Sequence, residues 1–301
     1  MTIRYDGRVA IVTGAGGGLG RAYAMMLAAR GAKVVVNDIG GAVDGSGSSK
    51  GPAQTVVDEI VAAGGEAVAN TDSVAEHDSA AAIVATAVDT WGKVDIVINN
   101  AGIVRDKAFH NMELDNFDFV VRTHLLGAAY VSHATFPVMR ANNYGRILMA
   151  TSHSGIFGNF GQSNYGAAKL GMVGLVNVLE IEGARYNIGV NAIAPLALTR
   201  MAETAPIFDG EEPAKATPDQ VAAMAGYLVS EDCRATGGVY SATAGYYSRI
   251  QLVEGAGIRL DKNVPATPDT IAARFAELSD MAQAREWPDV LAHLKYAMGI
   301  D

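Results

Sequence analysis

The chain has 301 residues, of which 50% are hydrophobic and 18% are charged, so it can bury a large core and a disordered protein is excluded. Its net charge of −9 argues against nucleic acid or an anionic membrane surface as the main partner, because both attract basic proteins. The single cysteine, Cys233, excludes an internal disulfide and a thiolate metal cluster, and we expect no metal site.

Short β-branched runs alternate along the chain with longer, alanine-rich stretches of helical period. The predicted strands are residues 9–12, 33–37, 67–70, 95–98, 146–150 and 189–193. The predicted helices are residues 21–30, 54–63, 79–91, 117–139 and 165–186. Such an order is typical of parallel β-α-β units. We therefore expect an α/β fold, a Rossmann-type doubly wound parallel sheet with helices on both faces.

Three segments interrupt this order. Residues 40–52 are rich in glycine and serine and are interpreted as a surface loop, a tolerated insertion that costs little entropy. Residues 196–218 contain prolines and small residues, and we interpret them as a substrate lid beyond the carboxyl ends of the strands. From residue 255 the chain is mostly helical, as over 267–278. We expect one domain over 1–254 and an extension over 255–301 that packs on it.

A glycine-rich turn follows the first predicted strand, at residues 13–20 (TGAGGGLG). Gly14 permits the tight turn, Gly18 lets the backbone approach a pyrophosphate, and Gly20 lets helix and strand pack closely. The phosphates then lie at a helix N-terminus, where the helix dipole favours negative charge. With a strand before it and a helix after it, this turn predicts a dinucleotide site.

Asp38 stands at the end of the second predicted strand, eighteen residues after Gly20. A carboxylate there can accept hydrogen bonds from both hydroxyls of the adenosine ribose, and it repels a 2′-phosphate. No arginine follows it directly. The sequence therefore predicts NAD rather than NADP, the alternative being a solvated aspartate at a strand end.

Three residues in the second half of the chain predict a dehydrogenase. Ser152 precedes Tyr165 by thirteen residues, and Lys169 follows four residues later, on the same face of a helix. A tyrosine has an ordinary pKa of about 10, and a lysine charge together with the positive nicotinamide ring should lower that pKa enough for Tyr165 to take a proton from an alcohol. Ser152 can hydrogen-bond the substrate oxygen. We expect hydride transfer between a secondary alcohol and its ketone.

These residues, with residues 13–20 and 99–102 (NNAG), resemble the short-chain dehydrogenase/reductase family over about residues 5–250. The resemblance implies that Lys169 also binds the nicotinamide ribose, that residues 72–74 lie beside the adenine, and that residues 195–199 surround the nicotinamide. The cofactor-binding residues expected from these motifs are Gly14, Gly16, Gly18, Leu19, Gly20, Asp38, Asp72, Ser73, Val74, Asn100, Ala101, Gly102, Tyr165, Lys169, Pro195, Leu198 and Thr199.

His124 departs from the family pattern, which usually has an asparagine twenty-eight residues before the serine to hold a proton-relay water. Histidine carries protons near neutral pH, so we add His124 to the catalytic candidates, with an inert helix residue as the alternative. His110, His133 and His153 lack metal-ligand spacing and are interpreted as structural or surface residues. His153 follows Ser152 directly and is also a candidate for the substrate mouth.

Residues 4–9, 36–41 and 154–162 are similar to a narrower subfamily, the dehydrogenase portions of type 2 peroxisomal multifunctional enzymes. That resemblance implies oxidation of a (3R)-3-hydroxyacyl-CoA, of fatty acyl or steroid side-chain type, with NAD as acceptor. The alternatives are a hydroxysteroid or other secondary-alcohol dehydrogenase acting on free alcohols, and a nucleotide-binding regulator with vestigial catalytic residues. Arg105, Lys107 and Arg200 are candidates for the CoA phosphates, but surface charges are the simpler interpretation.

Partners and location are further expectations. The predicted helices over 117–139 and 165–186 are apolar on more than one face, and the family uses them to dimerise, so we expect a homodimer or a dimer of dimers. No apolar run reaches about 18 residues. Residues 1–8 do not resemble a targeting peptide, and residues 298–301 are not a peroxisomal address. We expect a cytoplasmic protein.

Overall fold

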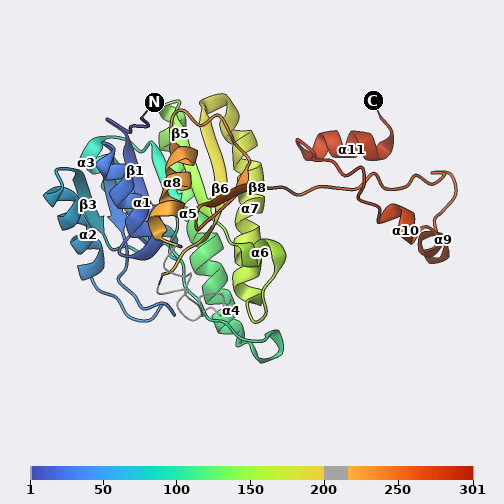
Figure 1. Ribbon diagram of the computed structural model, residues 1–301, viewed down its shortest axis with the longest axis horizontal. Coiled ribbons are helices and arrows are strands. Elements are labelled where there is room, and N and C mark those ends of the chain that lie inside the picture. The colour runs from blue at the N-terminus through green and yellow to red at the C-terminus, as the bar shows by residue number, and fades with distance from the viewer. Residues whose placement is uncertain (1, 200–215, 301) are drawn as a thin grey trace. The chain divides into compact units, whose positions relative to one another are not determined.

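An eight-stranded sheet is the core of the first 250 residues in the computed structural model, which describes residues 2–199 and 216–300 (Figure 1). The strand order is β3-β2-β1-β4-β5-β6-β7-β8, and every pair from β3 to β7 is parallel. The strands are β1 (Val9–Thr13), β2 (Lys33–Asn37), β3 (Glu66–Asn70), β4 (Ile96–Asn99), β5 (Gly145–Ala150), β6 (Ile188–Leu196), β7 (Val239–Thr243) and β8 (Tyr246–Ile250). The predicted Rossmann-type sheet is confirmed.

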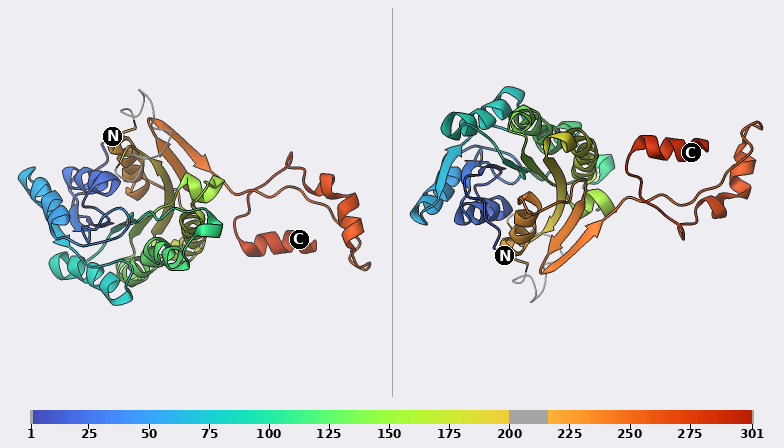
Figure 2. Two further views of the ribbon diagram at one scale, coloured as in Figure 1. Left: turned by 90° about the horizontal axis from the view of Figure 1, so that it is seen from below. Right: turned by 90° about the horizontal axis from the view of Figure 1, so that it is seen from above.

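Helices cover both faces of this sheet, as the end-on views of Figure 2 show. In one layer α1 packs between α2 and α8, and in the other α5 packs between α3 and α7. Because both faces are covered, the central strands β1, β4 and β5 are buried along their whole length. The helices are α1 (Gly18–Ala29), α2 (Gly51–Ala62), α3 (His77–Trp91), α4 (Leu114–Val121), α5 (Gly127–Ala141), α6 (His153–Phe157), α7 (Ser163–Gly183) and α8 (Pro218–Val229), with 3-10 turns η1 (Phe109–Asn111) and η3 (Ala184–Tyr186).

The structure adds two strands that the sequence analysis did not predict. β7 continues the parallel sheet beside β6. β7 and β8 are joined by Ala244 and Gly245, which both have positive φ, as in the tight turn of an antiparallel hairpin. β8 follows β7 with no helix between them, so the β-α alternation does not reveal this pair.

The single helix predicted over residues 117–139 is interrupted. α4 and α5 are joined by a π-helical turn, η2 (Arg122–Leu126), which has one more residue than an α-helical turn. His124 lies on this turn. Such single π turns occur frequently at functional sites, and nothing in the helical period of the sequence indicates this one.

The chain divides into two compact units, Met1–Arg249 and Ile250–Asp301. The second begins five residues earlier than expected and contains α9 (Pro268–Ala273), α10 (Phe275–Leu278) and α11 (Val290–Met298), so the predicted helix over 267–278 is two short helices. Within this unit the rings of Trp287 and Tyr296 lie 5.0 Å apart, and the indole of Trp287 donates a hydrogen bond to Glu254 (2.6 Å). The expected packing of the extension on the first domain stays a prediction.

Within the described ranges, no helix is both long and apolar enough to cross a membrane. The same ranges contain no group of three or more His, Cys, Asp or Glu side chains placed to hold a metal ion. Cys233 is buried and free.

Candidate active site

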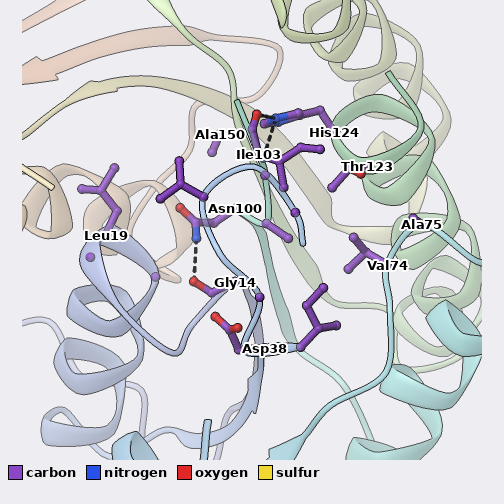
Figure 3. Close-up of a pocket in the computed structure, with 18 of the residues that line it drawn as sticks. Gly14, Leu19, Asp38, Val74, Ala75, Asn100, Ile103, Thr123, His124 and Ala150 are labelled. Atoms are coloured by element: carbon purple, nitrogen blue, oxygen red, sulfur yellow. Dashed lines mark hydrogen bonds between the residues drawn. The ribbon is translucent and has the colours of Figure 1, made fainter. Parts of the chain in front are cut away.

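A pocket of about 240 Å³ opens at the carboxyl ends of the central parallel strands, where ligands bind in sheets of this kind (Figure 3). In Figure 3, Asp38 lies at one end of the pocket and His124 at the other. Of the residues predicted to bind the cofactor, the pocket is lined by Gly14, Gly18, Leu19, Gly20, Asp38, Asp72, Ser73, Val74, Asn100, Ala101, Gly102, Tyr165, Lys169, Pro195 and Thr199. Gly16 and Leu198 are not among the lining residues, and their roles stay predictions.

The glycine-rich turn after β1 has no room for side chains. Gly14 has a φ of +64°, and a Cβ on it would lie 2.8 Å from the Cα of Ala101. A Cβ on Gly20 would lie 2.1 Å from the carbonyl oxygen of Gly14, so only glycine lets α1 approach the turn this closely. The expected roles of Gly14 and Gly20 in turn and packing agree with this geometry.

Residues 99–102 fasten the end of β4 to the same turn. The amide nitrogen of the Asn100 side chain donates to the carbonyl oxygens of Thr13 (3.0 Å) and Gly14 (3.1 Å), the latter bond drawn in Figure 3. The Thr13 hydroxyl accepts from the backbone N–H groups of Asn100 (3.0 Å) and Ala101 (3.1 Å). The NNAG motif therefore shapes the pocket floor through hydrogen bonds as well as through small size.

The N-terminus of α1 points its first backbone amides at the pocket. The residue before the helix, Gly17, has no side chain to cap it, and the first turn holds no carboxylate. Gly17, Gly18 and Leu19 all line the pocket. Uncapped amides at the positive end of a helix dipole form an anion site, so this part of the pocket fits a pyrophosphate.

Asp38 is held by the backbone on both sides. One carboxylate oxygen accepts from the N–H of Gly16 (2.8 Å) and the other from the N–H of Gly40 (2.7 Å). A Cβ on Gly16 would lie 2.8 Å from that carboxylate and 2.7 Å from Pro52. The absence of a side chain at Gly16 therefore leaves room for the Asp38 carboxylate, and Gly16 does not line the pocket itself. Each oxygen keeps a second lone pair for a ligand hydroxyl.

The loop after Asp38 also lines the pocket, through Ile39, Gly41, Ala42, Val43 and Gly45. The interpretation of residues 40–52 as a tolerated insertion did not foresee this. The feature of the sequence that could have predicted this is the position of the loop, which follows β2 directly after the predicted ribose-binding carboxylate.

The three predicted catalytic side chains meet at the end of β5. Ser152 precedes α6, and its hydroxyl accepts from the N–H of Ser154 (3.1 Å) and shares a hydrogen bond with Tyr165. Lys169, one turn further along α7, has its amine 5.4 Å from the centre of the Tyr165 ring. That amine donates to the carbonyl oxygen of Ala150 at the end of β5 (2.5 Å). Strand β5 and helix α7 together therefore assemble the site.

The pKa shifts of this group correct one expectation. Burial raises the pKa of Tyr165, and the hydrogen bond from Ser152 offsets this only in part. Burial also lowers the pKa of Lys169 to about 7. The lowering of the Tyr165 pKa expected from Lys169 is therefore wrong for the protein alone, because the low-dielectric surroundings disfavour both the phenolate and the ammonium. The part of the lowering expected from the nicotinamide ring stays a prediction.

His124 lies against Tyr165. Its ring is edge-on to the tyrosine ring, with centroids 5.1 Å apart at 87°. Nε2 lies 2.9 Å from the backbone nitrogen and 2.8 Å from the carbonyl oxygen of Ile103, as Figure 3 shows. Nδ1 is buried and has no hydrogen-bond partner within the described protein. Burial, together with the charge of Lys169, holds the pKa of His124 well below its usual value, so the ring is neutral.

His110, His133, His153 and Lys107 do not line the pocket. His153 is half-buried and shares a hydrogen bond with Ser241 of β7 (2.8 Å), while His110 and His133 are exposed. Lys107 pairs with Glu113 (3.2 Å). Arg200 and most of the predicted lid over 196–218 fall on residues 200–215, outside the described residues.

Comparisons with known proteins agree with this geometry. A family model described as short chain dehydrogenase matches residues 8–207. A Mycobacterium tuberculosis protein that carries the name of a short-chain type dehydrogenase/reductase is 51% identical over 278 residues, which cover 92% of this chain and 96% of that protein. The peroxisomal multifunctional enzyme type 2 of Mus musculus is 46% identical over 283 residues, which are 94% of this chain and 38% of the mouse enzyme. The chain thus spans less than half of that relative.

Solved structures are similar as well. Full-length peroxisomal multifunctional enzyme type 2 from Drosophila melanogaster has a TM-score of 0.80 at 36% identity, covering 98% of this chain and 49% of that one. A 7α-hydroxysteroid dehydrogenase in complex with NADH and 7-oxo glycochenodeoxycholic acid has a TM-score of 0.72 at 30% identity, covering 80% of this chain and 95% of that one. Sequence and structure point to the same group of enzymes.

Proposed function

Because the chain belongs to the short-chain dehydrogenase family and is an oxidoreductase, we propose that it oxidises a (3R)-3-hydroxyacyl-CoA to the 3-ketoacyl-CoA with NAD as acceptor. The observation that carries the reaction type is Tyr165 in the wall of the nucleotide pocket, with Lys169 beside it and with Ser152 near enough to lower its pKa through a hydrogen bond. The substrate class is supported by the 46% identity to the multifunctional enzyme over nearly the whole chain.

The pocket fits a nicotinamide dinucleotide. The uncapped amides before α1 would hold the pyrophosphate, and Asp38 would hold the adenosine ribose. Asp72, Ser73 and Val74 would lie beside the adenine, and Pro195 and Thr199 beside the nicotinamide. When bound, this cofactor supplies the hydride acceptor. The fixed negative charge of Asp38 supports NAD over NADP, since it would repel a 2′-phosphate.

Tyr165 is the proposed general base. Its phenolate takes the proton of the alcohol and becomes a phenol, while the Ser152 hydroxyl hydrogen-bonds the substrate oxygen and stabilises the charge that develops there. Ionised Tyr165 and protonated Lys169 stabilise each other, so in this buried pair the phenolate and the ammonium form together. The positive nicotinamide ring, when bound, would favour the phenolate further. It would thereby oppose the effect of burial, which raises the Tyr165 pKa.

His124 is proposed to act on the exit route of that proton. Its unpartnered Nδ1 is buried, and a buried polar atom of this kind is normally satisfied by a water or a ligand. The ring also supports Tyr165 edge-on and holds Ile103 by its Nε2. We expect a neutral histidine that relays or orients rather than a permanently charged one, because its pKa lies well below the ordinary value.

Steady-state kinetics in parallel would test the proposal. The expected result is turnover of a (3R)-3-hydroxyacyl-CoA at much higher catalytic efficiency than a free steroid alcohol, and with NAD above NADP. The likeness to a hydroxysteroid dehydrogenase favours the second candidate, a free-alcohol dehydrogenase. Negligible turnover of the thioester beside good turnover of a steroid alcohol would establish that alternative, and higher efficiency with NADP would refute the role of Asp38.

We also propose a homodimer or a dimer of dimers. Helix α7 carries exposed Leu170, Val178 and Ile181, and an exposed apolar stripe on a long helix is typical of a surface that a second subunit covers. Light scattering that returned the mass of one chain would contradict this. The cytoplasmic location stays a prediction, because the multifunctional relatives are peroxisomal.

A further inference from the structure

Residues 41–45, which we name the strap, form part of the pocket wall. Gly41, Ala42, Val43 and Gly45 line the pocket from the β2 side. The base of the loop is closed by a hydrogen bond from the N–H of Ser49 to the carbonyl oxygen of Ile39 (2.8 Å). The strap is therefore a shaped turn whose inner surface faces the nucleotide site.

The strap is fastened to the opposite wall, on the segment after β4. The carbonyl oxygen of Val43 accepts from the N–H of Val104 (3.0 Å). Gly45 fits against the side chains of Phe119 and Ile103, since a Cβ on it would lie 2.7 Å from the former and 3.1 Å from the latter. Ile103 and Phe119 line the pocket too. The strap thus joins two walls that belong to distant parts of the chain.

Arg105 makes a side-chain attachment to the strap. Its Nε donates to the carbonyl oxygen of Asp44 in the strap (2.8 Å). Its Nη1 donates to the side-chain oxygen of Asn116 on α4 (2.7 Å), and the guanidinium lies 4.3 Å above the ring of Phe119. A planar guanidinium suits this combination, because one plane serves two directed hydrogen bonds and a ring contact. Arg105 itself does not line the pocket.

We propose that Arg105 is a positioning residue for the cofactor, which holds the strap across the nucleotide pocket and so slows cofactor release. The inference rests on the proposed nicotinamide cofactor in this pocket. With the strap attached to Ile103, Val104 and Arg105, the nucleotide is enclosed between the Asp38 side and the α4 side. For it to leave, the strap must detach, and each attachment adds to that barrier.

Arg105 itself is joined to the catalytic half through its main-chain carbonyl oxygen. The carbonyl oxygen of Arg105 accepts from the Asn164 side chain (2.9 Å), which in turn accepts from the N–H of Tyr165 (2.7 Å). Removing the Arg105 side chain leaves these bonds in place. We therefore expect removal of the Arg105 side chain to change the rate of cofactor release but not the rate of hydride transfer.

The test is stopped-flow measurement of NADH release, together with single-turnover rates at saturating NAD. Arg105→Ala should release NADH roughly tenfold faster, since hydrogen bonds from a charged donor are the stronger kind, and its single-turnover rate should stay within about twofold. Arg105→Lys keeps the charge but not the planar fork, so an intermediate rate is expected. Arg140→Ala is the matched control, because Arg140 also stacks on an aromatic ring (Tyr186, 4.8 Å) but does not contact the strap.

Asn116→Ala is the second variant, for the case that Arg105→Ala does not fold. It removes the acceptor that orients the guanidinium, and about threefold faster release is expected. Release unchanged in both variants, or a fall of the single-turnover rate equal to the change in release, would overturn the inference. Failure of the unmodified chain to bind NADH at all would instead refute the proposed function, and this inference with it.

Discussion

The nucleotide half of the pocket and its catalytic half differ in the groups that form their walls. Around the glycine turn the wall is backbone, packed so closely that a single Cβ on Gly20 would lie 2.1 Å from a carbonyl oxygen. Around Tyr165, Lys169 and His124 the wall is made of buried titratable side chains whose pKa values are all shifted by burial. We infer that cofactor binding in the first half depends on close backbone packing and that catalysis in the second half depends on ionisable side chains. Substitutions in the two halves should therefore have different effects.

The largest effect is expected from Tyr165→Phe, which removes the proposed base but keeps the ring beside His124. Turnover should fall by roughly 10³-fold, within the range for loss of a general base, while NADH affinity stays within about threefold. Tyr23→Phe is the matched control, because the Tyr23 hydroxyl is buried in the core and has no hydrogen-bond partner within the described protein. Turnover of Tyr165→Phe within tenfold of the unmodified enzyme would end the assignment.

Gly20→Ala tests the close packing of the glycine turn in the nucleotide half, without changing any charge. The added Cβ overlaps the Gly14 carbonyl, and we expect the free energy of unfolding to fall by about 3 kcal/mol, with weaker NADH binding. In Gly51→Ala the nearest atom to the new Cβ is the Ser49 hydroxyl at 3.5 Å, an ordinary contact. That control should stay within about 0.5 kcal/mol in urea unfolding. Equal stability of the two variants would contradict the close approach of α1 to the turn.

His124→Ala tests whether the catalytic half extends to the π turn. We expect turnover to fall about tenfold with NAD binding retained, because a proton-transfer partner is lost but the base remains. His124→Asn, which introduces the residue usual in the family, should recover part of the loss. A purely structural histidine would instead show lower stability in both variants, with turnover per folded enzyme and its pH profile unchanged.

The smallest effect concerns the dependence of stability on pH. The folded pKa of Lys169, about 7, lies below its unfolded value of about 10.4, so between these values the unfolded chain binds more protons and stability rises with pH. Lys169→Met should remove up to about 1.4 kcal/mol per pH unit of that rise. Urea unfolding at about pH 7, 8 and 9 measures it. Lys107→Met, which removes an exposed amine, is the control. If the slope of unfolding free energy against pH were the same in Lys169→Met as in the unmodified chain, the Lys169 amine would not be buried.

Much of this molecule follows from local sequence. The glycine turn, six of the strands and the Tyr165–Lys169 spacing were all predicted, because tight turns, helical period and β-branched runs express physical constraints that act within a few residues. The same holds for Asp38, whose place at a strand end beside the pocket follows from the order of the elements.

Tertiary structure alone decided the rest. The place of His124 against Tyr165, the attachment of residues 41–45 to Arg105 across the pocket, and the pairing of β7 with β6 all depend on contacts between segments far apart in the chain. The same is true of the electrostatics. The spacing of Tyr165 and Lys169 predicts a lowered tyrosine pKa, but the depth at which the fold buries both groups reverses that direction, because desolvation is set by everything packed around a charge and not by its neighbours in sequence.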